Sequence, residues 1–120
     1  MKSYKDLIVW QKSMDLVEEI YKISSFLPNE EKFGLSLQIK RAAVSIPSNI
    51  AEGFERNTTK DYIKFLSIAK ASRAEVETQL LICQRLDFVN EEITEKAFDL
   101  CDEIKRMLTS MLKNMNNGNI

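Results

Sequence analysis

Apolar side chains recur at alternating steps of three and four residues along four stretches of this chain, and this spacing constrains the fold more than any other feature. It places the apolar side chains on one face of an α-helix, and that face must pack against another helix. The 120 residues include only three glycines and two prolines, which is little material for the turns of an all-β fold. A chain of this length usually forms one domain, so we predict a single all-α domain over residues 1–120.

The first two helices are predicted at residues 6–25 and 30–56, on either side of a turn at Pro28. Proline disfavours helix in the residue before it, and Asn29 is suited to begin the next helix. Pro47 lies inside the second helix, where it removes one backbone hydrogen bond and clashes with the carbonyl four residues back. We predict a kink there rather than a break, because the whole segment then matches its neighbours in length. The first helix is expected to pack through Leu7, Trp10, Met14, Val17 and Tyr21.

The third helix is predicted at residues 60–86 and the fourth from residue 91 to the start of a frayed tail at residues 116–120. Thr59 and Asn90 are the expected N-caps, because their side chains can accept hydrogen bonds from backbone N–H groups. The expected core seam of the third helix is Tyr62, Leu66, Ala69, Val76, Leu80 and Cys83. Short connections between four helices predict an antiparallel up-down-up-down four-helix bundle.

The fourth helix carries two neighbouring apolar seams, which is wider than one bundle core needs. One seam is Ile93, Ala97, Leu100, Ile104, Met107 and Met111, and the other is Phe98, Cys101, Leu108, Leu112 and Met115. Surplus apolar surface of this kind often marks a contact between subunits, so we expect self-association. The alternative is a broad core face on a fully packed helix.

The two cysteines are too few for a disulfide framework, and we expect both to be buried free thiols. In an antiparallel pair of helices that turns near Val89, Cys83 and Cys101 lie roughly 9 Å apart along the axis, beyond disulfide reach. No apolar run approaches the roughly 20 residues that span a bilayer, and the charged start lacks the apolar core of a signal peptide. We therefore expect a cytoplasmic protein with no membrane partner.

The most specific pattern is LSLQIKRAAVSIPSNIAEGFER at residues 35–56. On a helical wheel, six of its polar side chains fall within an arc of about 80° that borders the apolar face. We define this polar stripe as Gln38, Arg41, Ser45, Asn49, Glu52 and Arg56. It fits a solvated face in which Glu52 pairs with Arg56, or a half-buried hydrogen-bond network between helices or subunits. It also fits a ligand or phosphate site in which two arginines supply the donors.

The composition argues against an enzyme. The chain has no histidine, so the commonest general base and a common zinc ligand are missing. Glycine-rich phosphate loops and nucleophile elbows are absent, and a di-iron bundle would need a Glu-x-x-His motif. We expect no catalytic residues, no metal, no cofactor and no small-molecule ligand.

Charge is distributed unevenly along a chain whose net charge is −1. Residues 34–86 carry eight basic against five acidic side chains, and residues 87–120 carry four basic against seven acidic ones. The middle of the chain is thus mildly basic and the last helix acidic. Both an ordinary solvated surface and a patch that faces a polyanion are compatible with this asymmetry.

Several strings resemble the two signature stretches of a known family. They are FGL, QIKRAA and SIPSNIAEG within residues 33–53, and SRAEVETQL at residues 72–80. The chain resembles, over nearly its whole length, the bacterial four-helix-bundle family first noticed as proteins encoded within intervening sequences of 23S ribosomal RNA genes. Ala71 stands where that family often has glycine, and Asp87-Phe88 stands where a glycine-tyrosine turn is usual. The turn before the fourth helix is therefore expected to differ.

The resemblance implies a small cytoplasmic bundle that assembles as a ring-like homopentamer. Relatives of this family include accessory proteins of diversity-generating retroelements, which bind nucleic acid and a reverse transcriptase through a basic surface of the pentamer. By analogy, the candidate nucleic-acid contacts are Lys40, Arg41, Arg56, Lys60 and Lys64. One hypothesis is therefore an oligomeric, non-enzymatic accessory protein that binds RNA or DNA. The other is a protein-interaction or structural scaffold that binds no nucleic acid.

Overall fold

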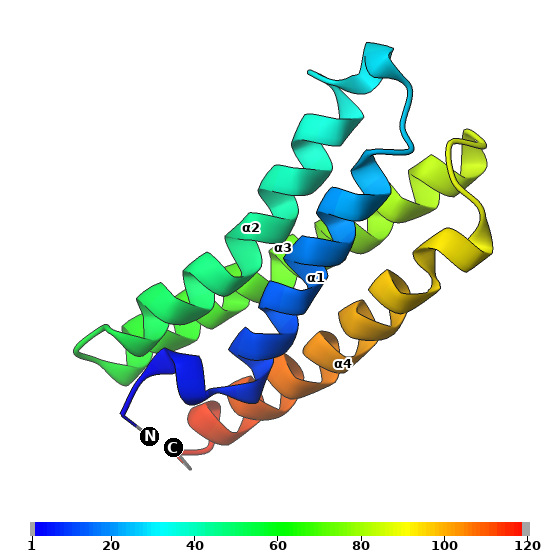
Figure 1. Ribbon diagram of the computed structural model, residues 1–120. Helices are drawn as coiled ribbons and strands as arrows, with labels where there is room; N and C mark the ends of the chain where they lie inside the picture. Colours follow the sequence, from blue (N-terminus) through cyan, green and yellow to red (C-terminus); the bar gives the residue numbers. More distant parts are fainter. Residues whose placement is uncertain (1, 119–120) are drawn as a thin grey trace.

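The computed structural model describes residues 2–118 as four long helices that lie side by side (Figure 1). They are α1 (Ile8–Ser24), α2 (Leu35–Phe54), α3 (Thr59–Arg85) and α4 (Glu91–Asn116), with short 3-10 helices η1 (Tyr4–Asp6) and η2 (Asn29–Glu31) before α1 and α2. Each helix packs against the next in the chain, and α1 packs against α4, so the four close a bundle. The predicted all-α four-helix bundle is confirmed.

The core is built from aliphatic side chains of all four helices. Its largest fully buried members include Leu16, Ile20, Ile39, Ile46, Ile50, Leu66, Leu80, Ile104 and Leu108. Each buried side chain of this size contributes about 1.5–3 kcal/mol relative to its exposed state. The apolar face that the helical wheel predicts for residues 35–56 lies in this core, with only Leu35 at its edge; its members are Leu35, Ile39, Ala42, Ile46, Ile50 and Gly53. The seam predicted for α3 also lies in the core, with only Tyr62 at its edge.

The buried face of α1 differs from the predicted one. The sequence predicts Met14 and Tyr21 in the core, but these side chains are 41% and 49% exposed. The side chains that α1 buries instead are Val9, Leu16, Ile20 and Ile23. Ser13 interrupts that face in the sequence, yet it is fully buried and its Oγ donates to the Val9 carbonyl at 2.6 Å. Because the hydroxyl is satisfied within its own helix, the polar residue fits the core.

Both apolar seams of α4 lie in the core or at its edge, including Phe98 and Leu112, which pack half-buried against it. In the described part of the chain, none of the large apolar side chains that remain exposed belongs to α4. The doubled seam therefore forms a broad core face, although Met107 and Met111 are only half-buried and line an open groove with Leu7 and Ile8. That the seam marks a contact between subunits stays a prediction, as does self-association itself.

α2 begins at Leu35, later than predicted, because the chain first forms η2. The Glu31 carboxylate then accepts a hydrogen bond from the Leu35 backbone N–H at 3.1 Å, which satisfies a donor at the new helix start. From there α2 runs through Pro47 to Phe54 without a break, as predicted.

The N-cap of α3 is Thr58, not the predicted Thr59, and its Oγ1 accepts a hydrogen bond from the Asp61 N–H at 3.2 Å. The N-cap of α4 is Asn90 as predicted, because its Oδ1 accepts from the Ile93 N–H at 2.9 Å. α4 extends to Asn116, the first residue of the predicted frayed tail. The last two residues of that tail, 119–120, lie outside the described residues.

Cys83 and Cys101 are free and buried, as predicted. Within residues 2–118, no helix combines the length and the low polarity that crossing a bilayer requires.

Candidate functional site

The middle of the polar stripe faces α3. The Oγ atoms of Ser45 on α2 and Ser72 on α3 lie 2.9 Å apart and share a hydrogen bond. Asn49 donates from Nδ2 to the Ser45 carbonyl at 2.7 Å and to the Ser45 Oγ at 2.9 Å. Ser72 is buried, and Ser45 and Asn49 are half-buried. These three side chains therefore form a hydrogen-bonded cluster between α2 and α3. Their polar atoms bond to one another at the helix interface.

The ends of the stripe are more exposed. At one end, Gln79 on α3 donates from Nε2 to the Gln38 Oε1 at 3.4 Å. At the other end, the guanidinium of Arg56 lies 4.5 Å from the centroid of the Phe65 ring on α3. Glu52 is exposed and forms no ion pair with Arg56 within residues 2–118. Four stripe residues therefore lie at the α2–α3 interface, namely Gln38, Ser45, Asn49 and Arg56, whereas Arg41 and Glu52 are exposed.

Gly53 allows α2 and α3 to approach closely at this end. A Cβ atom on Gly53 would lie 2.8 Å from the Cβ of Phe65 and 3.0 Å from the Tyr62 Cδ1. Both neighbours belong to α3, so a larger residue would push the helices apart. The glycine therefore sets the helix separation at which Arg56 reaches the Phe65 ring.

The five cations suggested by the family resemblance fall into two groups. Lys40 and Arg41 lie in the middle of α2, where the Lys40 Nζ sits 5.1 Å from the centroid of the Tyr21 ring on α1. Arg56 lies about 22 Å further along, at 1.5 Å per residue. Lys60 and Lys64 follow it on adjacent turns at the start of α3. The structure therefore places the five cations in two separate groups and does not gather them in one patch.

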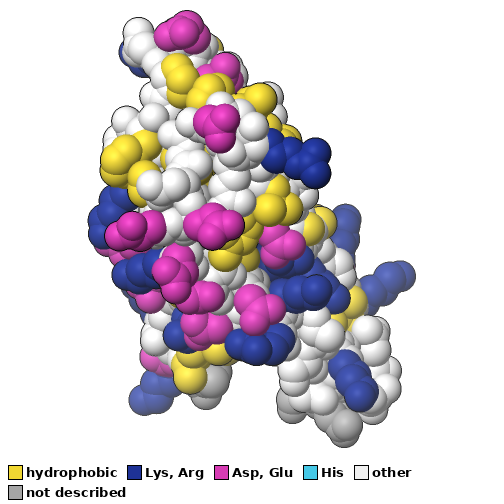
Figure 2. Space-filling view, turned by 90° about the vertical axis from the view of Figure 1, so that its right-hand side faces the viewer, with side chains coloured by type: hydrophobic (Ala, Val, Ile, Leu, Met, Phe, Trp, Pro, Cys, Tyr) yellow, Lys and Arg dark blue, Asp and Glu magenta, His cyan; other side chains and the backbone are white. Residues whose placement is uncertain are grey.

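None of these five cations forms an ion pair within the described residues. The hairpin between α2 and α3 also carries three exposed carboxylates, Glu52, Glu55 and Asp61, so its local charge is close to neutral. Figure 2 shows the side of the bundle where α4 runs, with acidic side chains interspersed with basic and apolar ones.

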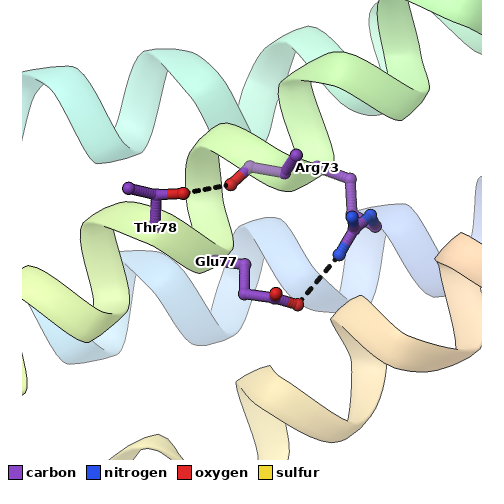
Figure 3. A network of polar contacts seen from close by, with 4 residues as sticks. Arg73, Glu77 and Thr78 are labelled. Carbon is purple, nitrogen blue, oxygen red and sulfur yellow. Dashed lines mark hydrogen bonds and ion pairs between the residues drawn. The ribbon is translucent and has the colours of Figure 1, made fainter.

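Arg73 is a functional candidate that the sequence reasoning did not single out. It lies on α3 with only 6% of its surface exposed, and its Nη1 donates to the Glu77 Oε2 at 2.9 Å, as Figure 3 shows. Its Nε is buried without a hydrogen-bond partner among the described residues. A buried arginine with one carboxylate partner is held at an energetic cost, because desolvation of the charge is only partly offset. The periodicity of α3 could have marked it, since Arg73 lies four residues after Ala69 and three before Val76, at a core position of the seam.

These geometries can be compared with known proteins. The model of the 23S rRNA-intervening sequence protein family matches residues 5–110. The chain belongs to this family. A search of curated proteins finds no match. Among solved structures, the chain is similar to the crystal structure of a protein with unknown function from the S23 ribosomal protein family of Bacteroides thetaiotaomicron. The identity is 30%, the TM-score is 0.82, and the match covers 88% of this chain and 99% of the other.

Membership of the 23S rRNA-intervening sequence protein family explains the fold but assigns no chemistry. The matched segment includes the polar stripe, the five cations and Arg73. Within residues 2–118, no group of three or more His, Cys, Asp or Glu side chains is placed to hold a metal ion.

The outer face of α1 and α2 carries an exposed apolar surface in this family member. An open groove of about 370 Å³ is lined by Tyr4, Trp10, Met14, Val17, Val44 and Pro47. A neighbouring groove shares Val44 and is lined also by Tyr21, Leu37, Lys40, Arg41 and Ser45. We call these two grooves together the α1–α2 apolar surface. Its α1 members are residues that the sequence predicts for the core. Trp10 and Val17 are half-buried and pack against the core, whereas Met14 and Tyr21 are exposed.

The two thiols are shielded rather than poised for reaction. Burial raises the pKa of the Cys101 thiol to about 12, against a smaller lowering effect of the Arg73 charge. Burial also raises the pKa of the Cys83 thiol. A thiol that stays protonated is a poor nucleophile and a poor metal ligand, so neither cysteine is suited to catalysis.

Proposed function

We propose that this member of the 23S rRNA-intervening sequence protein family is a cytoplasmic, oligomeric, non-enzymatic binding protein that self-associates through its α1–α2 apolar surface. One observation carries the proposal. Met14, Tyr21 and Val44 leave 41%, 49% and 41% of their surfaces in solvent on one continuous face. An exposed apolar surface of this extent on a small protein commonly marks a protein contact, because covering it removes apolar area from water.

Assembly also gives weak contacts a larger effect. Several copies present the same exposed groups at fixed spacing, and avidity then raises the affinity for an extended ligand. The homopentamer that the family resemblance implies would be one such assembly. The number of subunits follows from that resemblance and not from the shape of the surface.

The test is the mass in solution by light scattering. We expect an oligomer for the native protein and a smaller species for Met14→Glu and Val44→Glu, because a charge in an apolar contact is costly to desolvate. Ile68→Glu is the matched control, since Ile68 is a 39% exposed apolar residue on α3 outside this surface. A native monomer, or an unchanged mass in both variants, would contradict the proposal.

RNA or DNA is the ligand that we propose for this assembly, by analogy with the accessory proteins of diversity-generating retroelements. The supporting observation is that Arg56, Lys60 and Lys64, which lie outside the α1–α2 apolar surface, have no ion-pair partner among the described residues. Lys40 and Arg41 are unpaired there too, but they line that surface and would contact the ligand only from its edge. Cations free of carboxylates can contact phosphates, and binding then weakens as salt rises, because counterions are released. Arg56 and Lys40 are also held against aromatic rings, which limits their conformational freedom.

Light scattering with a mixed-sequence RNA at low salt tests this step. We expect a mass increase that high salt reverses. Lys60→Glu with Lys64→Glu should weaken binding and reduce the salt dependence without altering the mass of the free oligomer, because each lost phosphate contact lowers the salt slope by about one. Lys105→Glu is the control, because Lys105 is exposed on α4 and unpaired within residues 2–118.

A protein-interaction scaffold is the second candidate. The hydrogen bonds that Ser45 and Asn49 form within the α2–α3 interface favour it, because they engage the Asn49 amide and one of the two serine hydroxyls in packing instead of leaving them for a phosphate. An oligomer whose mass is indifferent to RNA at low salt would support the scaffold and contradict the nucleic-acid step.

A further inference from the structure

Another groove, with a volume of about 670 Å³, lies between α3 and α4. It is on the face opposite the α1–α2 apolar surface. Leu81 on α3 and Phe98 on α4 form its apolar lining, with Leu81 48% exposed and Phe98 half-buried. Beside them, Gln84 donates from Nε2 to the Oγ1 of the fully buried Thr94 at 2.8 Å. This hydrogen bond joins the two helices, so the groove is a preformed feature of the bundle.

The rim of this groove is acidic. Four carboxylates of α4 line it, namely Glu91, Glu92, Glu95 and Asp99, and none of them forms an ion pair within residues 2–118. Glu91 and Glu92 lie in the first turn of α4, where the helix dipole favours negative charge.

The dipole does not account for the other two. Glu95 and Asp99 lie one and two turns further into α4, beyond the reach of the dipole. They continue a series of like charges four residues apart, Glu91 to Glu95 to Asp99, and each such pair destabilises an isolated helix. The nearest cation along α3 is Arg85, which is exposed and makes no ion pair with any of them in the described part of the chain.

We infer that the α3–α4 groove docks a basic amphipathic segment of a partner protein, with an apolar residue against Leu81 and Phe98 and Lys or Arg side chains against the carboxylate rim. Charge complementarity selects this occupant. A nucleic acid would be repelled by four carboxylates, and an uncharged apolar segment would leave them without partners. Amphipathic helices bind in grooves of this kind, with apolar anchors three or four residues apart.

This inference goes beyond the proposed function and does not rest on it, because it concerns the opposite face and a different ligand. The probe is a fluorescein-labelled helical peptide of leucine and lysine at amphipathic spacing, measured by fluorescence anisotropy at low salt. Its counterpart carries glutamate in place of lysine. We expect the lysine peptide to bind and the glutamate peptide not to bind.

The double variant Glu95→Lys/Asp99→Lys should weaken binding of the lysine peptide by about tenfold or more. Leu81→Ala should weaken it less, because it removes only part of the apolar contact. Glu18→Lys is the matched control, since Glu18 is an exposed, unpaired carboxylate on α1 within the described residues, and it should leave the affinity unchanged.

Two results would overturn the inference. Equal affinity of the native protein and the Glu95→Lys/Asp99→Lys variant would show that the peptide binds elsewhere. A smaller oligomer in that variant would show that a second copy of this chain occupies the groove, and the mass measurement detects this separately from any change at the α1–α2 apolar surface.

Discussion

The Ser45 Oγ lies 2.9 Å from the Ser72 Oγ, across the interface between α2 and α3 and half a helical turn before Pro47. Proline has no N–H to donate, so the carbonyl one turn earlier loses its usual partner. Side chains around it form additional bonds to the same region, because Ser48 Oγ donates to the Val44 carbonyl at 2.7 Å and Asn49 Nδ2 donates to the Ser45 carbonyl at 2.7 Å. Two members of the polar stripe, Ser45 and Asn49, therefore form hydrogen bonds beside the proline-containing turn.

Ser45→Ala is expected to destabilise the protein by about 1–3 kcal/mol, because it leaves the buried Ser72 hydroxyl without its partner and removes one of the two hydrogen bonds that the Asn49 amide donates. Ser72→Ala should cost less, since Ser45 keeps its bond with Asn49. Urea unfolding measures both, read as a shift of the midpoint at constant slope. Ser48→Ala is the control and should stay within about 0.5 kcal/mol, because Ser48 is exposed.

Gly53→Ala is expected to destabilise the bundle, although alanine is ordinarily favoured over glycine in a helix by about 1 kcal/mol. The reversal follows from the 2.8 Å approach of the new Cβ to the Phe65 Cβ, which only a shift of α2 against α3 can relieve. Thermal unfolding should show a lower midpoint. Gly34→Ala is the comparison, because its nearest contact is the Glu31 Oε1 at 3.0 Å, the end of a flexible side chain. A higher midpoint in Gly53→Ala would contradict the close approach.

Asp87→Gly is expected to stabilise the protein by roughly 1 kcal/mol, because a residue other than glycine costs about that much in the left-handed conformation. Asp87 has φ 59° and terminates α3 in a Schellman motif, with the Phe88 N–H on the Cys83 carbonyl and the Asp87 N–H on the Gln84 carbonyl, each at 3.0 Å. Asp87→Val should be destabilising, since a β-branched residue fits that conformation poorly. Chemical unfolding checks the order of the three proteins.

The helix seams of α2 and α3 could be predicted from the sequence because in each the apolar residues at steps of three and four form the buried face, although α3 also exposes Ile68 and Leu81. α1 carries two stripes, and the sequence does not show which one the other helices cover. Trp10, Met14 and Tyr21 form the bulkier stripe, while the buried stripe is interrupted by Ser13, whose hydroxyl bonds to its own helix. That choice depends on shape complementarity with α2 and α4, which periodicity does not encode.

The candidate site was predictable only in part, for a similar reason. The wheel placed Ser45 and Asn49 beside the apolar face, and the structure uses them there in a contact with α3. Arg73 lies at a position of the α3 seam, between Ala69 and Val76, so the spacing predicts its burial. Its charge kept it out of the predicted core, because charged residues are rarely buried. The resemblance to the family singled out the turn at Asp87, because family members usually have glycine there. The positive φ of Asp87 explains why glycine is favoured at this position.

Glu77→Ala is expected to destabilise the protein by about 2 kcal/mol or more, because it leaves the buried Arg73 charge without its 2.9 Å partner. Arg73→Met should cost less than Glu77→Ala, since an apolar side chain of similar length removes the buried charge together with its unpartnered Nε. Thermal unfolding of both variants and of the double variant measures the coupling. If Arg73→Met proves the more damaging change, the arginine contributes contacts beyond this ion pair.

The stability of the fold should fall as pH rises through the alkaline range, in part because of Cys101. In the unfolded chain a cysteine thiol has a pKa of about 8.5, whereas burial raises the folded pKa of Cys101 to about 12. Below pH 8 the thiol is protonated in both states and contributes no pH dependence. Between these two pKa values only the unfolded chain gains by ionisation, so the free energy of unfolding falls with a slope approaching 1.4 kcal/mol per pH unit from this group.

The test compares the native protein with Cys101→Ala by urea unfolding between pH 8 and pH 11. Alanine lowers stability at neutral pH because it leaves a small cavity, so the slopes with pH are compared and not the absolute values. We expect the shallower slope in Cys101→Ala, with a remaining slope from groups such as Cys83 and Tyr62, whose pKa values burial also raises. Equal slopes, or rapid reaction of the native thiol with a disulfide reagent at pH 8, would show that the Cys101 sulfur reaches solvent in the folded protein.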